Sequence, residues 1–421
     1  MIPSGPPRPP DLEYPLTLRY TSFQRAKVLR ILILFWISAF DKRILEFIKN
    51  KGGDEMNKKI SKAMFKVLSV VAGLALILSL GLPEAMAQMK LKVGIIHIGS
   101  ITDAGYNQAH SEGVHLMKKN LPNIEVIQVE NVPEGADAER VMENMIRQGA
   151  KLIIPASFGY LDPALRVAKK YPDVKFVHPG GYKLAPNLGT YWASTPDAFY
   201  LMGIAAGKTT KTNKAGYVVA LPISFFLANI NAFHLGARSV NPQMETRVVF
   251  MGTFLDAPKE ATAANALLDQ GVDVMGVIVD SPITVVQAAE KRGVYSVGYH
   301  YLGVQKFAPK GWVSGIAFTW GELYTRFARQ VMDGTWKSEA LLGNLASDYL
   351  TIAPFGPAVP ADAIKLVNET KQEFIAAKKN TFQGPIKDNK GADRVKAGEF
   401  WPLTNIGRMD WLVEGVIGQP K

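Results

Sequence analysis

LKVGIIHIGSITDAGYNQA, residues 91–109, joins a short apolar run to a segment whose apolar residues recur at helical spacing. The run at 91–98 predicts a buried β-strand, and residues 105–120 predict the helix that follows it. The same pair recurs at 124–148 and at 151–170. Short buried strands that alternate with helices indicate parallel βαβ units.

This alternation continues in two series. The first is completed by strands predicted at 175–180 and 188–194. After a long helix at 198–208, the second series has strands predicted at 215–221, 246–252, 273–280, 294–300 and 312–318, with helices near 226–239, 258–270, 282–292, 322–332 and 361–378. Two tandem series predict an α/β protein with two doubly wound, parallel-sheet lobes. Because ligands bind beyond the carboxyl ends of such strands, we expect a cleft between the lobes that hinge closure buries.

Cysteine is absent from all 421 residues, which excludes disulfides, thiol nucleophiles and lipid attachment through a Cys. The net charge of +11 is unevenly distributed. Residues 1–55 carry nine Lys and Arg against six Asp and Glu, and residues 56–87 carry four Lys against one Glu. The remaining excess of +5 is mild for a chain of this size, and it argues against a nucleic-acid-binding face.

Residues 56–87 have the three parts of a secretory signal peptide. A basic Met56-Asn57-Lys58-Lys59 precedes the apolar run at 67–82, and Ala85-Met86-Ala87 gives a small-x-small cleavage pattern. We predict cleavage after Ala87 and a periplasmic protein without a lipid anchor. The alternative is a membrane anchor, but the apolar run has about 16 residues and a spanning helix needs about 20.

Residues 1–55 precede this signal, although signal peptides lie at N-termini. We interpret them as a non-native extension from a mis-assigned start, with translation beginning at Met56. Lys51-Gly52-Gly53 can be encoded by a ribosome-binding sequence, which agrees with this interpretation. The alternative is a real extension anchored by the apolar run at 28–40, which Arg30 interrupts.

Catalytic motifs are absent from the sequence. It has no phosphate-binding GxxxxGK[ST] loop, GxSxG elbow, HExxH pair or EF-hand loop, and its six His lack metal-ligand spacing. We therefore predict no enzyme activity, no metal and no cofactor.

Aromatic and polar side chains instead follow the predicted strands, where the cleft is expected. Aromatic rings can stack on a flat heteroaromatic ligand while a few polar groups read its edge. The alternative is that the rings fill the cores and that Asp280 or Ser281 caps the helix starting near Pro282. The candidate ligand-binding residues are Asp103, Tyr106, Asn107, Ser157, Phe158, Tyr160, Phe225, Asp280, Ser281, Tyr299, His300, Phe318 and Trp320.

Several stretches resemble the basic membrane protein (BMP) family of ABC substrate-binding proteins, which includes purine nucleoside receptors. They are KVGIIHIGSITDAGYNQA (92–109), ENVPEGADAERVMENMIRQGAKLIIPASFGYLDPALRVAKKYPDVKFVH (130–178), MGTFLDAPKEATAANALLDQGVDV (251–274) and MDGTWKS (332–338). They look most similar to a branch with an adenine-binding member. The resemblance implies a type I periplasmic-binding fold with three crossovers between its lobes. We assign 88–195 plus about 312–345 to lobe I, and about 196–311 plus 346–421 to lobe II and the C-terminal tail.

The family's first-loop motif falls on Asp103, Tyr106 and Asn107, which implies that the aromatic ring stacks on the base. This chain departs from the family at two positions that hold the ribose in nucleoside-binding members. Where nucleoside-binding members have Asp and Lys holding the ribose hydroxyls, this chain has His300 and Phe318. Losing both charged groups removes strong hydrogen bonds. The resemblance with these departures implies a free nucleobase rather than a nucleoside.

We therefore expect a monomeric binding protein that passes a small purine-like ligand to an ABC permease with its ATPase subunits, with no nucleic-acid partner. One alternative is a sensor subunit that engages a membrane receptor when closed. Another is an enzyme that processes a nucleoside or base. A DNA-binding regulator is disfavoured because no helix-turn-helix precedes Lys90.

Overall fold

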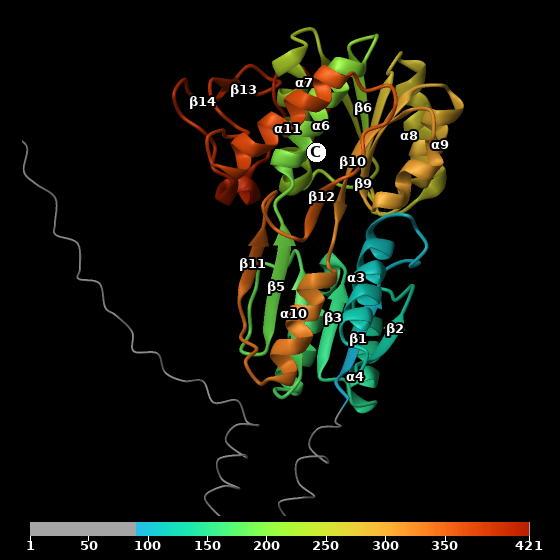
Figure 1. Ribbon diagram of the computed structural model, residues 1–421, viewed down its shortest axis with the longest axis vertical. Coiled ribbons are helices and arrows are strands. Elements are labelled where there is room, and N and C mark those ends of the chain that lie inside the picture. The colour runs from blue at the N-terminus through green and yellow to red at the C-terminus, as the bar shows by residue number, and fades with distance from the viewer. Residues whose placement is uncertain (1–89, 421) are drawn as a thin grey trace, which may run out of the picture. The chain divides into compact units, whose positions relative to one another are not determined.

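The computed structural model describes residues 90–420 (Figure 1). The predicted upstream extension at 1–55 and the signal peptide at 56–87 lie outside the described residues.

A six-stranded sheet forms the centre of lobe I, with strand order β11-β5-β4-β3-β1-β2, and every neighbouring pair is parallel. Apolar residues fill both sides of its inner strands: β3 is buried at every position. The strands are β1 (Lys92–His97), β2 (Glu125–Val129), β3 (Leu152–Ala156), β4 (Lys175–Pro179), β5 (Leu188–Ala193) and β11 (Ala340–Gly343). The helices of this lobe are α3 (Tyr106–Asn120), α4 (Ala136–Arg147), the short η1 (Phe158–Tyr160), α5 (Leu161–Lys170) and α10 (Gly321–Met332).

Lobe II is built on a seven-stranded sheet with the order β12-β10-β9-β8-β6-β7-β15, in which only β12 runs antiparallel to its neighbour. Its strands are β6 (Lys214–Val219), β7 (Glu245–Phe250), β8 (Val274–Ile278), β9 (Tyr295–His300), β10 (Trp312–Phe318), β12 (Leu350–Ile352) and β15 (Val416–Ile417). Its helices are α6 (Pro196–Thr209), α7 (Ser224–Val240), α8 (Ala257–Asp269), α9 (Ile283–Lys291), η2 (Leu302–Phe307) and α11 (Ala361–Ile375).

The chain passes between the two sheets three times: between β5 and α6, between β10 and α10, and between β11 and β12. Figure 1 shows the orange α10 and β11 among the blue and green elements of lobe I. The assignment of about 312–345 to lobe I was wrong for its first part. Residues 312–318 form β10, which pairs with β9 in lobe II, and only α10 and β11 return to lobe I. Sequence pattern could not locate the crossover, because β10 is as apolar as any inner strand.

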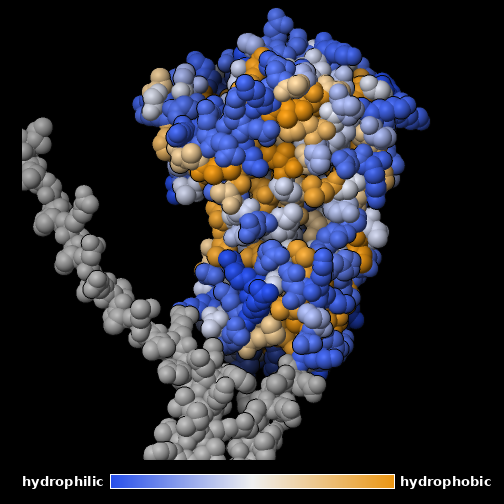
Figure 2. Space-filling model, viewed as in Figure 1, coloured by the Kyte–Doolittle hydropathy of each residue, from blue (hydrophilic) through white to orange (hydrophobic). Residues whose placement is uncertain are grey.

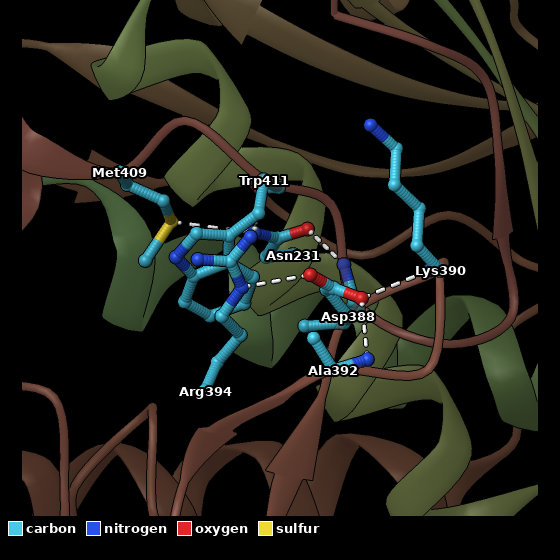
Figure 3. A network of polar contacts seen from close by, with 8 residues as sticks. Asn231, Asp388, Lys390, Ala392, Arg394, Met409 and Trp411 are labelled. Carbon is cyan, nitrogen blue, oxygen red and sulfur yellow. Dashed lines mark hydrogen bonds and ion pairs between the residues drawn. The ribbon is translucent and has the colours of Figure 1, made fainter.

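The C-terminal tail folds back onto lobe II. It contains β13 (Ile386–Lys387), β14 (Asp393–Val395) and η3 (Leu403–Arg408), and it ends by adding β15 to the edge of β7. In Figure 3 the side chain of Asn231, on α7, faces Met409 and Trp411 of the tail. Its Nδ2 donates to the Trp411 carbonyl (2.9 Å), and its Oδ1 accepts from the Val413 amide (2.9 Å). The tail is therefore fastened to α7 at a buried polar residue.

Candidate ligand-binding site

A cavity of about 760 Å³, counting the space at its mouth, lies between the two lobes. Most of the lining residues end or follow a strand, as expected for parallel sheets. Lobe I contributes Ile98, Tyr106, Ser157, Phe158, Pro179, Gly180 and Trp192, and lobe II contributes Ile223, Phe225, Phe226, Phe254, Ile278, Val279, Asp280 and His300.

Aromatic rings from both lobes form much of the cavity wall. Phe158 follows β3 in lobe I, and Phe225 lies in the first turn of α7 in lobe II. These two rings are 44% and 40% exposed, which is unusual for Phe and leaves their faces free for a ligand. Figure 2 shows that hydrophobic residues reach this face of the molecule mainly across its middle, while hydrophilic residues cover most of the rest. Such walls suit a flat, apolar-faced ligand.

Asp280 supplies a carboxyl group to this apolar cavity. It follows β8, it is 8% exposed, and its side chain makes no hydrogen bond with any residue of 90–420. Burial raises the pKa of this carboxyl well above its usual value, and the nearby carboxylates of Asp103, Glu260 and Glu134 raise it further. The helix-capping alternative does not apply, because α9 receives no side-chain cap.

His300 ends β9 and faces the same cavity. Its backbone has a φ of 75°, a conformation that non-glycine residues rarely adopt and that often marks a functional site. Its ring lies against Tyr299 and packs edge-on to Tyr106, with 5.5 Å between the latter pair of centroids. Burial lowers the pKa of His300 to about 3, so the imidazole is neutral and one ring nitrogen can donate while the other accepts.

The two lobes touch beside Asp280. The Tyr106 amide, at the start of α3 in lobe I, donates to the Asp280 carbonyl in lobe II (2.9 Å). The Ser281 hydroxyl donates to the Asp103 carbonyl in the opposite direction (2.8 Å). The structure is thus in a closed conformation, and the interlobe contact is continuous with the cavity wall.

Six of the predicted site residues line the cavity together: Tyr106, Ser157, Phe158, Phe225, Asp280 and His300. Ser157 also donates its hydroxyl hydrogen to Glu134 (2.8 Å). These residues come from both lobes and from well-separated parts of the sequence, and the rule that sites form at the carboxyl ends of strands found them.

The polar residues of the first loop are used within the protein instead. The Asp103 carboxylate accepts hydrogen bonds from the amides of Gly105, Asn107 and Gln108 and from the Asn107 side chain, at 2.8–3.0 Å. The Asn107 side-chain oxygen accepts from the Gly99 amide (3.2 Å). Neither side chain lines the cavity, contrary to the prediction, because both form hydrogen bonds that stabilise the turn at the start of α3. Ser281 is likewise used in the interlobe contact.

The remaining aromatic candidates lie behind the cavity wall. Tyr160 is fully buried in lobe I and donates to the Val132 carbonyl. Trp320 is also fully buried and stacks on Phe318, with 4.8 Å between ring centroids and 15° between planes. Tyr299 packs against Phe318 and supports His300 from behind. These four rings were predicted as ligand contacts, and the structure places them in the packing that holds the wall.

Trp192 and Phe254 are the chief lining residues that were not predicted. Trp192 belongs to β5, and Phe254 lies between β7 and α8. The rule that site residues follow strands misses Trp192, because this residue lies inside β5. Only the alternation of side chains between the two faces of the strand could have indicated it. Ile223 and Phe226 flank the predicted residue in the stretch PISFF (222–226), but only Phe225 was predicted. The other unselected lining residues are Ile98, Pro179, Gly180, Ile278 and Val279.

Two α/β lobes built on parallel sheets, with a cavity between them, define the periplasmic-binding fold. A solved ABC transporter solute-binding protein from Aeropyrum pernix K1 has this fold, with a TM-score of 0.61 and 19% identity, over 72% of this chain and 94% of that protein. The chain belongs to the family described as "ABC transporter substrate-binding protein PnrA-like" (Bmp), whose sequence profile matches residues 90–390. The predicted fold class and family resemblance are confirmed.

Two curated relatives carry different ligand names. A purine-binding protein of Brucella abortus (strain 2308) is 40% identical over 333 residues, which cover 79% of this chain and 94% of that protein. A putative ABC transporter glucose-binding protein of Haloferax volcanii is 32% identical over 324 residues, covering 77% and 80%. Within residues 90–420, no helix is both long enough and apolar enough to cross a membrane.

Proposed function

We infer that this protein captures a small purine-like ligand, a nucleobase in preference to a nucleoside, and delivers it to an ABC importer. The carrying observation is the interlobe cavity, in which aromatic rings of both lobes surround the unpaired carboxyl of Asp280. A heteroaromatic base has apolar faces for the rings and polar atoms along its edge for the carboxyl. Family membership and the Brucella purine-binding relative support the same ligand class.

The composition of the lining supports a base over a nucleoside or a sugar. Among the described residues that line the cavity, none is Lys or Arg. Ribose and glucose carry several hydroxyl groups, and each buried hydroxyl needs a hydrogen-bond partner. Ser157, Asp280 and His300 are too few polar side chains for that purpose. Phe318 packs behind the lining rings of Trp192 and His300, so this part of the wall presents aromatic surface.

Hinge closure about the three crossovers would bury the ligand and create the surface that the permease recognises. This function is capture and release, and it assigns no residue a chemical step on the ligand. The site would serve a periplasmic protein, released from its signal peptide after Ala87.

The experiment starts from the full chain, expressed with its leader and recovered without denaturation from the exported fraction. Native mass spectrometry identifies any bound small molecule, and calorimetry then measures adenine, hypoxanthine, adenosine, inosine and glucose. Tighter binding of a base than of its nucleoside is the expected result. Binding of glucose with no binding of purines would overturn the proposed ligand class. N-terminal sequencing should begin at Gln88, and a start near Met1 would contradict the predicted processing.

A further inference from the structure

Asp280 is the one carboxyl group lining the cavity among the described residues. Its two neighbours along the chain offer the cavity no free polar side chain: Ser281 donates to the Asp103 carbonyl, and Val279 is apolar and packs in the core of lobe II. The backbone of Asp280 is also fixed, because its amide donates to Phe254 and its carbonyl accepts from Tyr106. The backbone of Asp280 is therefore held at the cavity, and its carboxyl makes no hydrogen bond with any residue of 90–420.

The charged groups around Asp280 are acidic. Three carboxyl groups lie near enough to raise the pKa of Asp280: Asp103 in the turn before α3, Glu134 in the segment before α4, and Glu260 on α8. Asp103 accepts four N–H hydrogen bonds, which is the pattern of an ionised carboxylate. The other titratable groups nearby are the neutral phenols of Tyr106 and Tyr160 and the neutral imidazole of His300. An ionised Asp280 would lie buried beside carboxylates and without a cation.

We propose that Asp280 reads the ligand as a neutral carboxylic acid, so that the ligand must present a hydrogen-bond donor and an acceptor side by side on one edge. A protonated carboxyl offers one O–H donor next to one carbonyl acceptor. It forms a two-bond pair with an amino group beside a ring nitrogen, as in adenine, or with a ring N–H beside a carbonyl, as in hypoxanthine. This proposal rests on the proposed function and adds the protonation state and the edge chemistry of the ligand.

The same arrangement excludes other ligands. An ionised carboxylate only accepts hydrogen bonds, and its preferred partner is a cation with two parallel donors, such as an amidinium group. A neutral acid gains no charge–charge attraction from such a cation. Anionic ligands are also excluded, since Asp103 and Glu134 lie nearby and no Lys or Arg lines the cavity.

The test compares Asp280→Asn with Asp280→Ala in the full-length exported protein. An amide also places a donor beside an acceptor, so Asp280→Asn should keep adenine affinity within about threefold, whereas Asp280→Ala should lose about tenfold to a hundredfold. Asp173→Asn, at an exposed residue in the turn before β4, is the control. Equal losses in Asp280→Asn and Asp280→Ala would overturn the proposal, as would tighter binding of benzamidine than of adenine.

The pH dependence gives a second readout. The binding-competent form is protonated, so adenine affinity should fall as pH rises through the pKa of Asp280 in the free protein, by about tenfold per pH unit above it. Asp280→Asn should show no such fall over roughly pH 5 to 9. A wild-type affinity that rises with pH, while that of Asp280→Asn does not, would overturn the proposal.

A ligand-free measurement separates this proposal from the proposed function. The ¹³C shift of the Asp280 carboxyl, assigned by its loss in Asp280→Asn, reports its protonation directly. If no purine binds, the proposed function fails, but a protonated carboxyl at neutral pH still supports the proposal that Asp280 is a neutral acid. An ionised carboxyl at neutral pH overturns it whatever the ligand.

Discussion

Gly105 and Asp280 approach so closely across the interlobe contact that a Cβ atom on Gly105 would lie 1.8 Å from the Asp280 carbonyl oxygen. No side chain can occupy this position while the lobes are closed, since the obstacle is backbone. The next residue, Tyr106, donates its amide to that same carbonyl (2.9 Å), and Asp280 also lines the cavity. One residue thus links the ligand site to the contact that holds the lobes together.

Gly105→Ala is expected to prevent full closure. Because the added methyl group cannot coexist with the Asp280 carbonyl, the lobes must separate and the hydrogen bond from Tyr106 is lost. We expect purine affinity to fall by about tenfold or more, while each lobe stays folded. Calorimetry measures the affinity, and small-angle scattering should no longer show compaction when ligand is added.

The control for this variant is Gly407→Ala, since a Cβ at Gly407 meets nothing within 4 Å. Wild-type affinity in Gly105→Ala would mean that ligand binding does not require the closed contact.

Phe225→Ala tests the aromatic wall. The ring is 40% exposed and lines the cavity, so its removal should cost little folding stability but most of its contact with the ligand. Stacking of a base on an aromatic side chain contributes about 1–3 kcal/mol, which predicts a weakening of roughly fivefold to a hundredfold. Phe400→Ala removes a ring of similar exposure (51%) outside the cavity lining. Equal purine affinity in the two variants would show that Phe225 does not contact the ligand.

The sheets and six of the fifteen residues that line the cavity were predicted from the sequence for the same reason. Parallel strands place their carboxyl ends at one edge, so residues that follow strands, such as Phe158 and Asp280, converge whatever their separation along the chain. The rule cannot say which polar side chains form hydrogen bonds within their own loop and are therefore not available to a ligand. Asp103 and Asn107 satisfy the rule, but the amides of the α3 turn use them.

The crossover after β10 explains the other misplaced candidates. Residues 312–318 read as one more buried strand, and nothing in their pattern reveals to which sheet they belong. Because β10 joins lobe II and α10 returns to lobe I, Phe318 and Trp320 lie at the crossover and stack on each other behind the wall. Pairing between residues far apart in the sequence sets the sheet to which β10 belongs, and the local periodicity of residues 312–318 does not show it.

His97 predicts a loss of stability in acid. Burial lowers the pKa of His97 to about 4, and neither ring nitrogen has a hydrogen-bond partner within residues 90–420. The unfolded chain binds a proton at this histidine below about pH 6.5. Between these two values the unfolded state holds more protons, so the free energy of unfolding falls as pH falls, by up to about 3 kcal/mol for this one group.

Urea unfolding at a series of pH values between about 7 and 4 measures this effect. His97→Leu should reduce the slope of stability against pH, whereas His115→Gln, at an exposed histidine on α3, should leave it unchanged. Identical slopes in wild type and His97→Leu would show that His97 is not buried in its neutral form.

Asn231→Ala tests the fastening of the C-terminal tail, most of which follows the residue at which the family profile ends, 390. Asn231 is fully buried and bonds the Trp411 carbonyl and the Val413 amide (Figure 3). Alanine leaves both backbone groups buried without these partners, at about 1–3 kcal/mol each, so the free energy of unfolding should fall by about 2–6 kcal/mol. Asn265→Ala removes an amide from the exposed face of α8, where alanine is a good helix former, and should change stability little.

Limited proteolysis gives the local readout. If the tail is held through Asn231, the alanine variant should be cut within residues 380–420 well before the lobes are digested, and an unchanged digestion pattern would show that the edge strand β15 holds the tail without it.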